Sequence, residues 1–185
     1  MTQGEIGMAA SATRRALLIA GGVAAGTGAA GLLWVRAGNG GAVLTVDAAL
    51  QKIDTMTKRT MASTGKWNPY QVFTHCAQSI EFSMTGYPSP KPKLFQDTAG
   101  AAAFALFSAK GRMKHALAEQ IDGAPMPEAK PGTREALARL RQAFERFRAF
   151  DGALAPHFAY GPLDKRQYEQ AHVMHFYNHL DEIKA

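Results

Sequence analysis

The sequence predicts an all-α fold: a bundle of four main helices with one further helical piece inserted and long crossover loops. Apolar side chains recur at three- and four-residue spacing along each predicted helix, the period of a helix with one buried face. Capping residues stand where the helices should start, and stretches rich in proline and glycine separate them. There is essentially no strand signal, so a β-sheet is not expected.

The composition favours one globular domain of ordinary size. Hydrophobic residues make up 46% of the 185 residues and charged residues 19%, which separates the chain from disordered proteins. The net charge of +6 comes from lysines and arginines scattered among acids, so no nucleic-acid partner is expected. Cys76 is the only cysteine, which excludes an intrachain disulfide and a cysteine-based zinc site.

The N-terminal segment has the features of a targeting signal. Arg14 and Arg15 precede about 20 uncharged residues rich in alanine and glycine, and Arg36 closes the run. This resembles a twin-arginine export signal, and it is also long enough for a transmembrane anchor. A buried N-terminal helix of the domain is the alternative.

The export interpretation divides the chain into three parts. Residues 1–36 form the signal or membrane anchor, residues 37–44 a linker, and residues 45–185 the helical bundle domain. No convincing Ala-x-Ala cleavage site precedes the linker, which leaves an uncleaved anchor open. Because the paired arginines stay inside, the domain is expected on the periplasmic side of the inner membrane.

The first two predicted helices have clear boundaries. Thr45 is a good N-cap, and the helix that follows ends before residues 63–65, Ser-Thr-Gly. Asn68 caps the second helix, with Pro69 at its first position, where the missing N–H has no cost. This helix should reach about Tyr87.

The middle of the chain alternates loops and helices. Residues 88–92 contain three prolines and form a crossover, and residues 98–120 are predicted to be helical with a break at Lys110-Gly111. Residues 123–132 form a second proline-rich loop, after which Thr133 caps a helix with a strong apolar stripe. The stripe consists of Leu137, Leu140, Phe144, Phe147 and Phe150.

The last helix carries three histidines on its apolar face. Asp164 and Gln167 form a capping-box pattern at its start. His175 and His179 are four residues apart, a spacing at which two imidazoles can bind one metal ion, the alternative being buried, hydrogen-bonded histidines. His172 lies about 10 Å along the axis from His179, too far for the same ion, so it is expected in the pocket wall or behind the ligands.

A third ligand should come from a facing helix. His75 is the only histidine on another main helix, although it could instead be an interfacial histidine bonded to a carbonyl. His157 stands in a loop before the last helix and could approach the site from its rim. His115 is expected on the solvated surface of the inserted helix, and Cys76 in the core.

Three stretches carry a family resemblance. Residues 74–81 (Thr-His-Cys-Ala-Gln-Ser-Ile-Glu), 157–163 (His-Phe-Ala-Tyr-Gly-Pro-Leu) and 175–180 (His-Phe-Tyr-Asn-His-Leu) resemble the DinB-like (DinB/YfiT) metalloenzyme superfamily. Within it they resemble the domain-of-unknown-function branch numbered 1569. The resemblance covers residues 45–185 and implies a four-helix bundle.

The resemblance also implies a metal site. By matching position, its triad falls on His75, His175 and His179. A further histidine is common in this branch where Asn178 stands here. Three neutral imidazoles leave a divalent ion with open positions; zinc is expected first, with nickel, iron or manganese as alternatives.

The reaction is expected to involve a metal-activated thiol or water. The resemblance implies thiol-dependent transferase or isomerase chemistry on a small molecule, with a low-molecular-weight thiol as second partner and hydrolysis as a second chemistry. Tyr168, His172 and His157 are the candidates for proton transfer, packing being their alternative role. The competing hypothesis is a non-catalytic, membrane-tethered metal-binding or interaction module. The oligomeric state stays open, a homodimer included.

Overall fold

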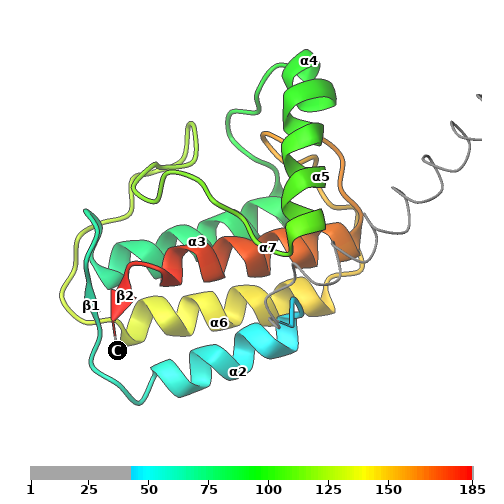
Figure 1. Cartoon of the computed structure of the whole chain (residues 1–185). Coiled ribbons are helices and arrows are strands. Elements are labelled where there is room, and N and C mark those ends of the chain that lie inside the picture. Colours follow the sequence, from blue (N-terminus) through cyan, green and yellow to red (C-terminus); the bar gives the residue numbers. More distant parts are fainter. Residues whose placement is uncertain (1–42, 185) are drawn as a thin grey trace, which may run out of the picture. The chain divides into compact units, whose positions relative to one another are not determined.

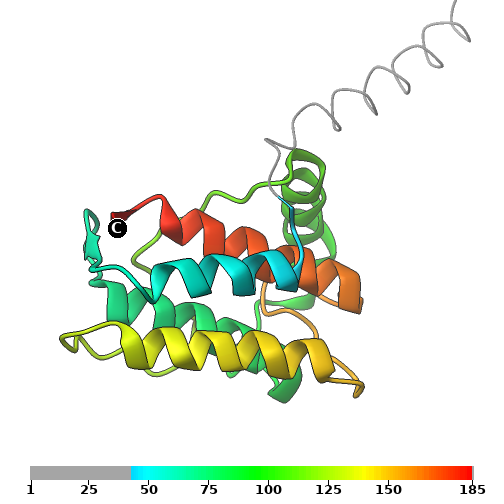
Figure 2. The ribbon, with the colours of Figure 1, turned by 90° about the horizontal axis from the view of Figure 1, so that it is seen from below.

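The computed structural model describes residues 43–184 and confirms the all-α prediction. Four helices form the bundle: α2 Val46–Met56, α3 Pro69–Thr85, α6 Arg134–Ala149 and α7 Lys165–Leu180. Helix α3 packs most extensively against α6 and also contacts α7, while α2 contacts both α6 and α7 (Figures 1 and 2). The histidine-bearing helices α3 and α7 are therefore neighbours.

The predicted signal or anchor, residues 1–36, lies outside the described residues, as does most of the linker. Among the helices that the structure does describe, none has the length and apolar character needed to span a membrane.

Side-chain caps fix the starts of the two helices that matter for the site. At α3 the Asn68 side chain accepts from the Gln71 N–H, and the Gln71 side chain accepts from the Asn68 N–H. Asp164 and Gln167 form the same reciprocal pair at α7, which confirms the predicted capping box. Each cap provides partners for N–H groups that have none within the helix. It thereby fixes the residue at which the helix begins and the face on which the following histidines lie.

The insertion runs across the bundle and is shorter than predicted. It consists of α4 Lys93–Phe95, the π-helical turn η1 Gln96–Gly100 and α5 Ala101–Lys110, which Figure 2 shows nearly end-on. The helix predicted to reach Gln120 ends at Lys110, because Gly111 takes a left-handed conformation with φ 63° and caps it. Residues 112–120 are not helical, so this part of the prediction was wrong.

Amide side chains of α3 hold the long segment that follows α5. The N-cap Asn68 and two glutamines of α3 donate hydrogen bonds of 3.1–3.2 Å to carbonyls of this segment: Asn68 to Lys130, Gln71 to Pro127 and Gln78 to Pro125. Proline-rich chain cannot form a regular ladder, so side chains provide the donors that its carbonyls need. The loop is thereby fastened along the helix that carries His75.

The core and a small sheet complete the domain. The largest fully buried side chains come from all four bundle helices, with Phe73, Phe144 and Phe176 among them, and Cys76 is buried as expected. Strands β1 Ala62–Ser63 and β2 Ile183–Lys184 pair antiparallel, which links the segment after α2 to the segment after α7. This two-residue pairing was not predicted.

Candidate metal centre

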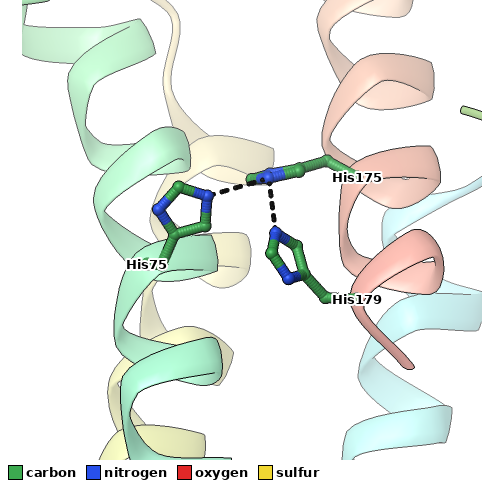
Figure 3. A group of neighbouring side chains, drawn as sticks. All are labelled: His75, His175 and His179. Carbon is green, nitrogen blue, oxygen red and sulfur yellow. Dashed lines mark hydrogen bonds between the residues drawn. The ribbon is translucent and has the colours of Figure 1, made fainter. Parts of the chain in front are cut away.

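Three imidazoles converge between α3 and α7. His75 projects from α3, and His175 and His179 project from successive turns of α7 (Figure 3). The Nε2 atom of His175 lies 3.1 Å from Nε2 of His75 and 3.1 Å from Nε2 of His179. One nitrogen from each residue lies within 4.8 Å of the others. The structure thus brings together the three residues that the sequence and the family resemblance single out.

Burial isolates this group from water on one side. His179 is fully buried and His75 nearly so. The indole of Trp67, just before α3, packs edge-on against His75 at 5.1 Å and parallel to His179 at 6.5 Å between ring centroids. Trp67 therefore forms an apolar wall of the site, a role that the sequence did not reveal because tryptophan is equally common in plain cores.

The surroundings keep the three rings uncharged. Burial, with a smaller effect from neighbouring histidines, lowers the pKa of His75 to about 4 and that of His179 to about 2. Burial also holds the pKa of His175 well below its usual value, with His179 and His75 adding to the effect. All three are neutral at pH 7, which is the form in which imidazole binds a metal.

Hydrogen bonding alone does not satisfy these nitrogens. Each Nε2 of a neutral imidazole carries either a proton or a lone pair, so His175 Nε2 can donate to only one of its two neighbours, or offer both a single lone pair. The Nδ1 atoms of His75 and His179 are also buried and find no partner in the described part of the chain. A divalent ion bound by three nitrogens about 2.1 Å away would separate them by roughly 3.0–3.4 Å, close to the observed 3.1 Å. The donor set fits such an ion.

A pocket opens beside the histidines. Its volume is roughly 200 Å³, and His75 and His175 form part of its wall. Ser79, Lys91 and Tyr160 also line it, and Lys91 is paired with Asp122 at 2.6 Å. A small molecule in this pocket would contact two of the three candidate ligands.

His172 faces a different partner. Its Nε2 lies 3.1 Å from the Ser83 hydroxyl, which itself donates to the Ile80 carbonyl, so the imidazole N–H donates to the serine oxygen. The ring packs edge-on against Phe147 and stacks on Tyr168. Both ends of this bond are buried, which makes it part of the bundle core.

Ser83→Ala should destabilise the protein without affecting metal binding. The change leaves the buried His172 N–H unpaired, which costs about 1–3 kcal/mol of unfolding free energy. Denaturant unfolding measures the loss, and metal titration of the folded variant should give the wild-type stoichiometry. Loss of the metal in a folded Ser83→Ala protein would instead place His172 in the metal site.

The other two candidates for proton transfer also have engaged polar atoms. The Tyr168 hydroxyl donates to the Ala155 carbonyl at 2.7 Å, and burial raises the pKa of this phenol. His157 Nδ1 accepts from the N–H groups of Ala159 and Tyr160 at 3.1 and 3.2 Å. In this arrangement Tyr168 and His157 stabilise the loop that leads into α7.

His115 was wrongly predicted to be solvated. It follows the end of α5, its Nε2 is buried, and its ring centroid lies 5.0 Å from that of His175 and 5.1 Å from that of His179. Its backbone N–H donates to the Asn178 side chain at 3.1 Å. The break at Gly111 is the sequence signal that could have removed His115 from a helix surface.

Comparison with known proteins gives one match. A family model described as "Protein of unknown function (DUF1569)" covers residues 43–185. No curated protein matches the chain, and no solved structure does. The match includes all of the helices of the bundle and every histidine of the candidate site.

Proposed function

This chain belongs to the DUF1569 family, and on that premise we propose that its domain is a DinB-like, divalent-metal-dependent enzyme that activates a thiol or water. The observation that carries the proposal is the convergence of three neutral imidazole nitrogens at the wall of a pocket. We also propose that residues 1–36 act as a twin-arginine-like signal or anchor, which would place the domain on the periplasmic side of the inner membrane.

His75, His175 and His179 would hold the ion, with zinc first and nickel, iron or manganese as alternatives. When bound, the ion lowers the pKa of a thiol or water towards neutral pH and so supplies a nucleophile. The neutral ligands leave its full charge in place. Trp67 excludes water on one side, and the pocket admits the substrate on the other.

The pocket wall suits a small polar substrate. Glu119 contributes a negative charge beside the ion pair of Lys91 and Asp122, and Ser79 and Tyr160 contribute hydroxyl groups. With a volume of roughly 200 Å³ the pocket is smaller than most drug-sized sites. The first chemistry of the proposal is a low-molecular-weight thiol attacking a small electrophile, in transfer or isomerisation, and ester hydrolysis is the second.

A structural role for the ion is the competing function, and the deep burial of His179 and His75 favours it. In that case the ion would link α3 to α7, and chelation would lower the melting temperature without exposing an exchangeable position. The pocket beside the site supports the enzymatic proposal, since a purely structural site has no need of access.

Turnover tests the enzymatic proposal. The protein loaded in turn with zinc, nickel, iron or manganese should convert members of a panel of electrophiles with a thiol, or of esters, and His175→Ala should abolish the activity. Lys114→Ala, an exposed change outside the site, should retain it. Absence of turnover with all four metals would favour the structural role.

A further inference from the structure

His115 brings a fourth imidazole to the edge of the three-histidine site. The ring centroids of His75, His175 and His179 are 4.7–5.0 Å apart. His115 lies at the same range, 5.0 Å from His175 and 5.1 Å from His179, and it lines the pocket with His75 and His175. It comes from the segment between α5 and α6 rather than from a bundle helix.

The local bonding fixes the tautomer of His115. Its Nδ1 lies 2.8 Å from the Ala116 carbonyl, and because a carbonyl only accepts, Nδ1 carries the proton. In the neutral ring Nε2 then holds a lone pair. That atom is buried and has no hydrogen-bond partner among residues 43–184. A buried acceptor of this kind calls for a donor such as a water molecule.

The position of His115 is tied to the helix that carries two of the candidate ligands. Its N–H donates to the side chain of Asn178, the residue before His179 on α7. The two bonds, one from the backbone to α7 and one from Nδ1 to Ala116, hold the ring beside the site. Asn178 therefore helps to place His115, because its Oδ1 accepts the His115 N–H.

His115 stands beside the candidate ligands rather than among them. One nitrogen each from His75, His175 and His179 falls within a mutual distance of 4.8 Å, and no nitrogen of His115 joins that set. An ion bound about 2.1 Å from all three would lie beyond direct bonding distance of His115.

We propose that His115 is a positioning residue, whose Nε2 accepts a hydrogen bond from the water molecule that shares the site with a metal ion held by His75, His175 and His179. This inference rests on the proposed function, since it needs an ion with an open position. His115 would orient the water through this hydrogen bond. A ligand that has no proton to donate to Nε2 would bind less tightly.

Azide binding tests the proposal in cobalt-loaded protein, where optical absorption reports ligand exchange. Azide carries no proton. In the wild type it would therefore displace a water that is hydrogen-bonded to His115 Nε2 and leave that acceptor without a donor. His115→Phe keeps the bulk of the ring and removes the acceptor.

We expect this variant to bind azide about 3- to 10-fold more tightly than the wild type. The cobalt affinity of His115→Phe should differ from that of the wild type by less than about threefold, because His115 does not bind the ion directly. Lys114→Ala, next to His115 and exposed, should match the wild type in both measurements.

A second measurement needs no substitution. In wild-type protein labelled with ¹⁵N-histidine and loaded with ¹¹³Cd, one-bond coupling should appear for His75, His175 and His179, and not for His115. Coupling at His115, or a cobalt affinity that falls more than about tenfold in His115→Phe, would make it a fourth ligand and overturn the proposal. Unchanged or weaker azide binding would overturn it as well. If the wild type itself binds neither metal, the proposed function fails first, and the inference fails with it.

Discussion

Replacing His175 with alanine is expected to weaken divalent-metal binding by at least about 100-fold, the upper range for loss of a residue that only supports a ligand. His175 is the central member of the site, since its Nε2 lies 3.1 Å from both of the other two Nε2 atoms. Without His175, only His75 on α3 and His179 on α7 would remain as ligands. Competition titration against a chromophoric chelator measures the affinity.

His172→Gln is the matched control for this experiment. It alters another buried histidine of α7 whose N–H is bonded to Ser83, and the glutamine amide can still donate. The control should bind metal as tightly as the wild type. Equal affinities for the His175→Ala variant and the wild type, with both folded by circular dichroism, would show that the ion is bound elsewhere.

Lowering the pH from 7 to 5 is expected to reduce the unfolding free energy of the metal-free protein by about 4 kcal/mol through His157 and His172 alone. Burial lowers the pKa of His157 to about 3 and that of His172 to about 3, against 6.5 in the unfolded chain. Below pH 6.5 the unfolded state therefore binds more protons than the folded state, and stability falls until the pH approaches 3. Each histidine contributes about 2 kcal/mol between pH 7 and 5.

Denaturant unfolding in the presence of a chelator, at pH 8, 7, 6 and 5, measures this dependence. Buried histidines of the metal site should steepen it, because burial lowers their pKa values as well. In His172→Gln the decrease should be smaller by about 2 kcal/mol, since one titrating group is gone. A stability that stays constant between pH 7 and 5 would contradict the burial of these rings as neutral groups.

The sequence predicted those features that depend on local spacing. His175 and His179 are four positions apart, so any helix places them on one face, and the Asp164–Gln167 capping box marks where that helix starts. The role of His75 was different: the residues alone allowed either a third ligand or an interfacial histidine bonded to a carbonyl, and the family resemblance was needed to favour the ligand. The structure shows that α3 and α7 do pack together.

The features that were missed depend on contacts between distant parts of the chain. His115 reaches the site because Gly111 ends α5 and because Asn178, far along the chain, accepts its N–H. Neither a helix period nor a local motif contains that information. Trp67, the residue before the Asn68 cap, was likewise not predicted to belong to the site, although it forms an apolar wall of it.

The metal content of the purified protein tests the central claim most directly. After incubation with zinc and removal of unbound metal, elemental analysis should find about one ion per chain in the wild type. His75→Ala on α3 and His179→Ala on α7 should each lose it, because the site needs ligands from both helices. A wild-type protein without bound metal, or two variants that retain it, would contradict the account.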